Sequence, residues 1–253
     1  MSQENTHSLA VKQAETILSP EYVAAHAESP ATPPSGGDFY SAFPLQDGSE
    51  DVAVIIGDVA GHGPEQAMQA EHMRELISDS ISVGLTPAET LTAVNAMIEP
   101  DPNFEGFGTV FVGMLEAGTG RLTYASGGHE PALIASARKQ DPASIEELLG
   151  TGPPVGAFPP EMAHYEQHEA VLPAGGTLLL YTDGVSDARP PHTRLEWLGL
   201  ERLKALLARL TSHSPRRLVS ELLRRVSAFC QGRFHDDVAV MAIRRRVRRP
   251  SRK

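Results

Sequence analysis

The sequence predicts an α+β sandwich, in which β-sheets pack together and helices cover them. Segments with the two-residue period of strands and the 3.6-residue period of helices come in blocks along the 253 residues, whereas a doubly wound fold would alternate them strictly. Two apolar runs, VAVIIG and TLLLYT, each continue directly into an aspartate. Continuous apolar runs of this kind are typical of strands buried on both faces, so we expect covered sheets.

The first 35 residues are predicted to form a helical and linker segment. Apolar side chains near one helical face indicate one or two short helices within residues 1–27. The proline- and serine-rich stretch SPATPPS at 29–35 then predicts a linker. The folded domain is therefore expected to span residues 36–243.

Strands are predicted within that domain where apolar or alternating runs are bounded by turn residues, at 38–43, 52–58, 109–116, 121–126, 131–135, 165–172, 177–182 and 237–244. The three strands between 109 and 135 read as a meander, and the stretch 138–165 as irregular.

Helices are predicted where start signals precede periodic apolar residues, at about 64–83, 87–98, 195–210 and 215–230. Pro64 suits the first turn of the first helix. The second helix begins at Thr86-Pro87-Ala88-Glu89, which combines an N-cap, a proline and a capping box. The inner stripe of the first helix is expected to comprise Met68, His72, Leu76 and Ile77.

Composition excludes several classes of protein. The hydrophobic content of 41% and the charged content of 21% are ordinary for a globular protein. No apolar run reaches the roughly 20 residues of a membrane span, and the N-terminus lacks the apolar region of a signal peptide. A single cysteine, Cys230, excludes an internal disulfide and favours a buried residue in a reducing compartment. We therefore expect a cytoplasmic protein.

The charge is unevenly distributed along the chain. The formal net charge is −10, but the last ten residues, RRRVRRPSRK, carry seven cations and no acid. The remainder holds 32 acidic and 15 basic residues, a balance that argues against nucleic acid as the main partner. Residues 244–253 are typical of a disordered basic tail; docking to an acidic partner or a membrane surface is the alternative.

Aspartates at strand ends and turns carry the main chemical signal. They are Asp38 in GGDFY, Asp58 in GDVAGHG, Asp183 in YTDG and Asp236 in HDDVAV. Because these phrases are far apart in the sequence, only a fold can bring the carboxylates together. Carboxylates that converge repel one another unless a cation neutralises them. Each phrase alone also fits an acidic turn or a helix cap, so the prediction rests on their combination.

The donor chemistry favours Mg²⁺ or Mn²⁺ over zinc. These phrases offer hard oxygen ligands, with no cysteine and no histidine pair. Two such ions about 3.5–4 Å apart form a known device for hydrolysing phosphate esters. The predicted ligands are the carboxylates of Asp38, Asp58, Asp183 and Asp236 together with the backbone carbonyl of Val59.

Residues beside these phrases are weaker candidates. His62 and His129 are candidates for phosphate binding or acid–base chemistry. Gly184 follows Asp183 in a turn, and Asp237 follows Asp236 but points the opposite way along a strand. A structural role is the alternative for each of them.

Taken in order, the phrases resemble the PPM superfamily of metal-dependent serine/threonine protein phosphatases, in its bacterial SpoIIE/RsbU-like branch. Together they cover nearly all of residues 36–243. The matching phrases are GGDFY (36–40), GDVAGHG (57–63), FGTVFVGMLEAGTGRLTYASGGHEPALI (107–134), GTGPPVGAF (150–158), LLLYTDGVSDAR (178–189) and HDDVAVMAI (235–243).

The resemblance implies an αββα sandwich, with two antiparallel β-sheets packed face to face and flanked by helices, and a metal site at one edge. It implies that Asp58 bridges two Mn²⁺ or Mg²⁺ ions and that the Val59 carbonyl helps to hold one. Asp38, Asp183 and Asp236 complete the carboxylate set, with Asp237 behind them. Catalysis would then use a water activated by the metals, which attacks phosphorus in line.

The resemblance also implies partners. The expected substrate is a phosphoserine or phosphothreonine on a STAS-domain anti-sigma-factor antagonist, whose dephosphorylation releases a sigma factor in a stress-response circuit. The N-terminal helix is expected to mediate self-association or to bind a regulator. We expect neither nucleic acid nor a membrane span.

The sequence departs from the family pattern in two places. An acid usually follows GGDFY within a few residues, where this chain has Ser41-Ala42-Phe43. The helix after GHG is also unusually polar, with Glu65, Gln66, Gln69 and Glu71. The polar helix keeps one alternative open, a PPM-fold scaffold that binds a phosphoprotein without turnover. A hydrolase of small phosphate esters is a second alternative, because the four acids do not decide between protein and small-molecule substrates.

Overall fold

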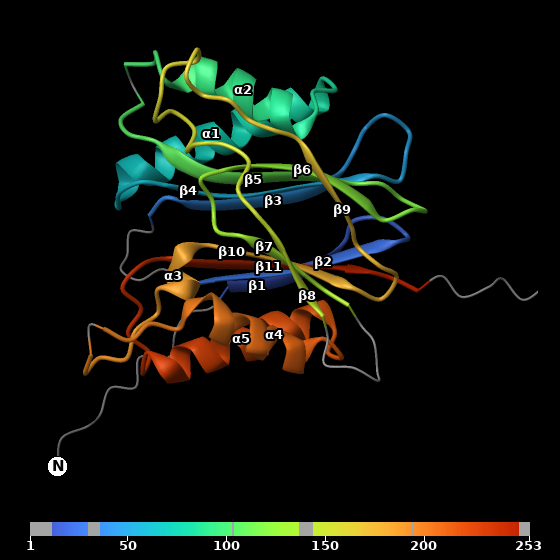
Figure 1. Cartoon of the computed structure of the whole chain (residues 1–253), viewed down its shortest axis with the longest axis vertical. Helices are drawn as coiled ribbons and strands as arrows, with labels where there is room; N and C mark the ends of the chain where they lie inside the picture. Colours follow the sequence, from blue (N-terminus) through green and yellow to red (C-terminus); the bar gives the residue numbers. More distant parts are fainter. Residues whose placement is uncertain (1–11, 30–35, 103, 137–143, 194, 248–253) are drawn as a thin grey trace, which may run out of the picture.

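The computed structural model describes residues 12–29, 36–102, 104–136, 144–193 and 195–247. Its strands form two sheets that pack face to face, with helices on both outer faces (Figure 1). Every strand pairing within these sheets is antiparallel. The predicted αββα sandwich is therefore confirmed.

Each sheet is named here after a central strand. The β11 sheet has the order β1 (Lys12–Ile17), β2 (Tyr22–Ser29), β11 (Val238–Arg245), β10 (Thr177–Tyr181), β7 (Ala132–Ala135) and β8 (Ile145–Leu148). The β4 sheet has the order β3 (Asp38–Pro44), β4 (Val52–Val59), β5 (Gly108–Leu115), β6 (Arg121–Gly127) and β9 (His168–Val171).

The helices cover the two outer faces of the sandwich. α1 (Pro64–Ser82) and α2 (Pro87–Ile98) lie on the β4 sheet, and α4 (Gly199–Leu210) and α5 (Pro215–Phe229) on the β11 sheet (Figure 1). The single-turn helix α3 (Asp183–Ser186) lies at one end. The predicted capping box of α2 is confirmed, with the Thr86 N–H donating to Glu89 Oε2 at 2.9 Å. None of the described helices is both long and apolar enough to span a bilayer.

Three apolar layers hold the sandwich together. Phe111 belongs to the layer between the sheets, Leu207 and Leu222 to the layer under α4 and α5, and Met73 and Leu91 to the layer under α1 and α2. Each of these side chains is fully buried, and such burial contributes about 1.5–3 kcal/mol per large apolar side chain. β4 alternates between two layers, which explains its continuous apolar sequence.

The N-terminal segment differs from the prediction. Residues 12–29 form β1 and β2 instead of helices, and they belong to the β11 sheet, so the folded domain begins before residue 36. Tyr22 and Ala24 face the layer between the sheets, whereas Ala25 and Ala27 face α5. Alanines are good helix formers, so only this two-residue alternation distinguishes the strand. Residues 1–11 and 30–35 lie outside the described residues.

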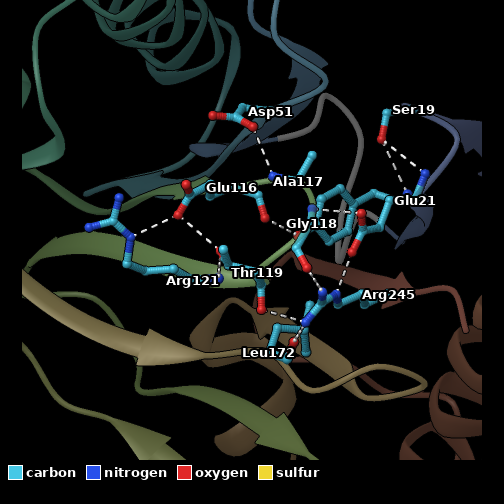
Figure 2. A network of polar contacts seen from close by, with 11 residues as sticks. Ser19, Glu21, Asp51, Glu116, Ala117, Gly118, Thr119, Arg121, Leu172 and Arg245 are labelled. Carbon is cyan, nitrogen blue, oxygen red and sulfur yellow. Dashed lines mark hydrogen bonds and ion pairs between the residues drawn. The ribbon is translucent and has the colours of Figure 1, made fainter. Parts of the chain in front are cut away.

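The prediction of a disordered basic tail over residues 244–253 is also partly wrong. Arg244 and Arg245 are the last residues of β11, and the side chain of Arg245 is bound within a network of polar contacts (Figure 2). Its Nε lies 2.5 Å from Oε1 of Glu21, and these two side chains are only 11% and 2% exposed. Its two amino groups donate to the carbonyls of Gly118, Thr119 and Leu172. These arginines therefore belong to the fold, and residues 248–253 lie outside the described part.

Three smaller expectations are corrected. The predicted meander is wrong, because β7 does not pair with β6 but with β10 in the β11 sheet. The stretch expected to be irregular contains β8, which pairs with β7. The inner stripe of α1 runs through Met73 and Ile77, while Met68 is 68% exposed and His72 is exposed as well. Gly108 admits Met73, because a Cβ there would lie 2.8 Å from the Met73 sulfur.

Candidate metal centre

Antiparallel pairing brings the predicted ligands to one edge of the sandwich. In the β4 sheet, the start of β3 meets the end of β4, so Asp38 and Asp58 are direct cross-strand partners. In the β11 sheet, the end of β10 meets the start of β11 in the same way. Asp183, the first residue of α3, lies two residues after this end of β10, and Asp236 lies two residues before β11. Each sheet therefore contributes two of the four aspartates.

Hydrogen bonds join the two pairs across the sandwich. The hydroxyl of Thr182 donates to Asp38 Oδ2 at 2.8 Å. The backbone N–H of Gly36 donates to Asp237 Oδ2. Both bonds link the start of β3 to the neighbouring ends of β10 and β11 in the other sheet. The four predicted aspartates thus lie at the same edge, at the end of the sandwich where α3 lies (Figure 1).

The carboxylates strongly perturb one another. Burial, and then the charge of Asp58, raises the pKa of Asp38 well above its ordinary value. Burial, followed by the charges of Asp183 and Asp236, raises the pKa of Asp58 to about 7. Burial, followed by the charge of Asp236, raises the pKa of Asp183 to about 6. Among the described residues, no cation is a cause of these shifts, so the cluster has no protein counter-charge.

The donor set fits a hard divalent cation, although the site is not preassembled. No three histidine, cysteine or carboxylate side chains in the described ranges are already arranged to hold a metal ion. Carboxylates that share a site without a counter-charge repel one another, which favours such an open arrangement. The cluster offers carboxylate oxygens, which suit Mg²⁺ or Mn²⁺. The charge of Asp58 acts on Asp38, and the charges of Asp183 and Asp236 act on Asp58, so the carboxylates of the two sheets interact.

Glycines let the backbone approach this edge closely. A Cβ on Gly37 would lie 1.9 Å from the Val59 carbonyl oxygen and 2.7 Å from Asp58 Oδ1. The Val59 carbonyl therefore lies beside the Asp58 carboxylate, where we predicted a further ligand. A Cβ on Gly184 would lie 1.9 Å from the carbonyl oxygen of Asp237. Close packing against the start of β11 thus accounts for a glycine at position 184.

The two histidines lie in contrasting environments. His62 is exposed on the loop that follows Asp58. His129 is buried, with Nδ1 2.9 Å from the hydroxyl of Thr109, and Thr109 pairs with Asp58 across β4 and β5. Burial lowers the pKa of His129 to about 4, so this ring is neutral near pH 7 and lies behind Asp58.

Two residues near the cluster were missed from the sequence. Thr182 is fully buried and binds Asp38, as described above. Glu130 is half-buried, and its charge contributes to the raised pKa of Asp183. A threonine before Asp-Gly and a glutamate after Gly-His carry no distinctive sequence signal, because their roles depend on partners from other strands.

Comparisons with known proteins agree with this architecture. The family model described as Stage II sporulation protein E (SpoIIE) matches residues 48–246. The phosphoserine phosphatase RsbU of Bacillus subtilis (strain 168) is 25% identical over 211 residues, which cover 83% of this chain and 60% of that protein. The chain thus spans less than two thirds of the length of this curated relative.

Solved structures show the same fold. The RsbU and RsbW domains of Rv1364c from Mycobacterium tuberculosis match with a TM-score of 0.78 and 28% identity, covering 93% of this chain and 63% of that one. RsbX in complex with magnesium matches with a TM-score of 0.64 and 14% identity, covering 92% and 98%. Because the family model spans most of the sandwich, including Asp58, Asp183 and Asp236, the chain belongs to the SpoIIE family.

Proposed function

We propose that the protein is a Mn²⁺- or Mg²⁺-dependent phosphoserine/phosphothreonine protein phosphatase. One observation carries the proposal: four carboxylates from remote segments lie at one edge, and burial and neighbouring carboxylate charges raise the pKa values of Asp38, Asp58 and Asp183, with no cation of the described residues among the causes. Membership of the SpoIIE family and the similarity to a phosphoserine phosphatase support the same activity.

Each residue has an assigned role in this proposal. The carboxylates of Asp38, Asp58, Asp183 and Asp236 and the backbone carbonyl of Val59 would hold the ions. When bound, the ions lower the pKa of a water molecule and neutralise charge on the phosphoryl oxygens.

Residues around the ligands support the site. We assign to His62, which is exposed on the loop after Asp58, a contact with the phosphoryl group of the substrate. Asp237 is held by the Gly36 N–H, and Gly184 by its close packing, so both shape the site without binding metal. His129 is neutral and buried behind Asp58, which favours a structural role.

The proposed substrate is a phosphorylated STAS-domain anti-sigma-factor antagonist in a partner-switching circuit. The similarity to RsbU, a phosphoserine phosphatase, and to the RsbU and RsbW domains of Rv1364c supports this assignment. We further propose that the reaction takes place in the cytoplasm, because a lone buried cysteine suits a reducing compartment.

A second candidate is a scaffold that binds a phosphoprotein without turnover. The open arrangement of the carboxylates in the described residues favours it. The polarity of α1 is weaker support for the scaffold, because polar side chains of this helix have structural contacts. In the amide orientation that satisfies its neighbours, Gln69 bonds the backbone N–H and carbonyl of Glu105 at 3.1 and 3.0 Å.

Hydrolysis assays separate these candidates. We would measure phosphate release from p-nitrophenyl phosphate, from a phosphoserine peptide and from a phosphorylated STAS-domain protein, with MnCl₂ or with EDTA. The proposal predicts Mn²⁺-dependent turnover of the phosphoprotein that is lost in Asp183→Asn. Turnover of the small ester alone would indicate a small-molecule phosphatase, and binding of the phosphoprotein without any turnover would indicate the scaffold.

A further inference from the structure

The hydroxyl of Thr182 occupies a fixed position between the two sheets, beside the candidate metal centre. Thr182 directly follows β10 and is 0% exposed. Its backbone N–H donates to the carbonyl of Ala239 at 3.1 Å, which continues the pairing with β11. Its hydroxyl oxygen lies 2.9 Å from the Ala239 nitrogen and 2.8 Å from Asp38 Oδ2. One side chain thus joins the β11 sheet to the first residue of β3.

The direction of the hydroxyl proton follows from these neighbours. The N–H of Ala239 can only donate, so the Thr182 oxygen accepts from it. An ionised Asp38 can only accept, so the single hydroxyl proton points to Asp38 Oδ2. The carbonyl oxygen of Ala239, at 3.5 Å, lies beyond the usual O–H···O distance. Thr182 is therefore a donor whose orientation is set by the β10–β11 pairing.

A donor fixed in this way selects one orientation of the Asp38 carboxylate. Thr182 is fully buried and its hydroxyl oxygen is held by the Ala239 N–H, so the bond to Asp38 Oδ2 has a fixed direction. The bond also engages Oδ2 and leaves Oδ1 without a hydrogen bond to any described residue. Asp38 thus keeps one oxygen for a cation.

We propose that Thr182 is a positioning residue of the metal centre: its hydroxyl holds the Asp38 carboxylate in one orientation, in which Oδ2 is engaged and Oδ1 is available to a cation. This inference rests on the proposed metal-dependent function and deepens it. Groups that hydrogen-bond to metal ligands orient them, and their loss typically weakens metal binding about 10- to 100-fold.

Conservative substitutions test the role. Thr182→Ser keeps the hydroxyl, whereas Thr182→Val keeps the shape and removes the donor. We would titrate Mn²⁺ by calorimetry into the full chain of the wild type, both variants, Asp38→Asn and the double variant Thr182→Val/Asp38→Asn. We expect Thr182→Ser to bind like the wild type, and Thr182→Val to raise the Kd for Mn²⁺ about 10- to 100-fold.

The double variant separates positioning from general destabilisation. If Thr182 acts through Asp38, Thr182→Val adds no further weakening in the Asp38→Asn background. Thr182→Val also removes the acceptor of the Ala239 N–H, so we expect a lower Tm in EDTA. If this destabilisation were the only cause of weaker Mn²⁺ binding, Thr182→Val would weaken binding equally with and without Asp38→Asn. Should Thr182→Val not fold, Thr182→Ala replaces it with the same expected order.

Three results would overturn the inference while leaving the metal centre in place. They are an unchanged Kd in Thr182→Val, an equal loss in Thr182→Ser, and equal weakening with and without Asp38→Asn. If the wild type itself binds no Mn²⁺, the proposed function fails together with this inference. The wild-type titration alone distinguishes that result from the other three.

Discussion

Asp38 and Asp58 lie directly opposite each other on β3 and β4, although like charges in register across an antiparallel pair destabilise a sheet. The neighbouring cross-strand pair, Phe39 and Gly57, fixes this register. A Cβ on Gly57 would lie 2.3 Å from the ring of Phe39, so only glycine fits opposite that ring. The fold therefore imposes a repulsion between two half-buried carboxylates, which a bound cation relieves.

Removing one of these charges is expected to separate stability from activity. Asp58→Asn relieves the repulsion, so we expect it to stabilise the metal-free protein by an amount on the order of 1 kcal/mol. The same change removes a carboxylate proposed to hold the metal ions, so we expect Mn²⁺-dependent hydrolysis to fall about 100-fold or more. Urea unfolding in EDTA and p-nitrophenyl phosphate assays measure the two effects. Asp79→Asn, on the exposed face of α1, is the matched control and is expected to change neither.

The raised pKa values predict a pH dependence of the metal-free protein. A carboxyl group whose pKa is raised by folding binds more protons in the folded state than in the unfolded state. Its stabilising contribution is therefore present at low pH and is lost as pH rises through the folded pKa. For Asp58, the loss falls between its ordinary value of 3.8 and about 7.

Comparing two proteins isolates this contribution from other titrating groups. We would measure the free energy of unfolding of the wild type and of Asp58→Asn in EDTA from about pH 5 to 8. This pH range covers about the upper half of the expected loss of stability from Asp58. The wild type should lose stability relative to the variant as pH rises, and saturating Mn²⁺ should abolish the trend. A difference that stays constant with pH would show that Asp58 is not perturbed in this way.

Gly37 is predicted to be indispensable because of its position beside the ligands. In Gly37→Ala, the new methyl group would meet the Val59 carbonyl and Asp58 Oδ1 at 1.9 and 2.7 Å, so the backbone must move. We expect a loss of stability and a loss of Mn²⁺ binding by calorimetry. Gly150→Ala is the control, because its nearest neighbour would lie 4.0 Å away. Normal Mn²⁺ binding by Gly37→Ala would contradict the assigned role of the Val59 carbonyl.

The pairing of Arg245 with Glu21 predicts that the end of β11 is essential for stability. Arg245→Met removes the guanidinium that pairs with the buried Glu21 carboxylate, and breaking a buried ion pair typically costs about 3–5 kcal/mol. We expect Arg246→Met, at an exposed position, to stay within about 0.5 kcal/mol of the wild type. Urea unfolding measures both. Equal stabilities for the two variants would mean that the network of Figure 2 does not hold the sheets together.

Local sequence signals predicted much of the fold and the ligand set. β4, α2 and the position of Asp58 near a strand end were predictable because apolar runs, a capping box and an acid at a strand end each act within a few residues. The missed elements depend on distant partners. β2 is rich in alanine and becomes a strand by pairing with β11.

Two side chains show the same limit. Arg245 reads as part of a basic tail, yet its partner Glu21 lies 224 positions away in the sequence. Thr182 gains its role only because β10 and β11 place it between Ala239 and Asp38. Residue type and spacing therefore predict the candidate metal ligands, whereas the groups that contact those candidates required the three-dimensional pairing.

Anomalous diffraction from crystals grown with MnCl₂, recorded at the manganese absorption edge, tests the candidate metal centre most directly. The account predicts anomalous density at the edge of the sandwich, among the carboxylates of Asp38, Asp58, Asp183 and Asp236, and its loss in Asp183→Asn crystals. Crystals of protein with Mn²⁺-dependent phosphatase activity that show manganese elsewhere, and none among these four carboxylates, would contradict it.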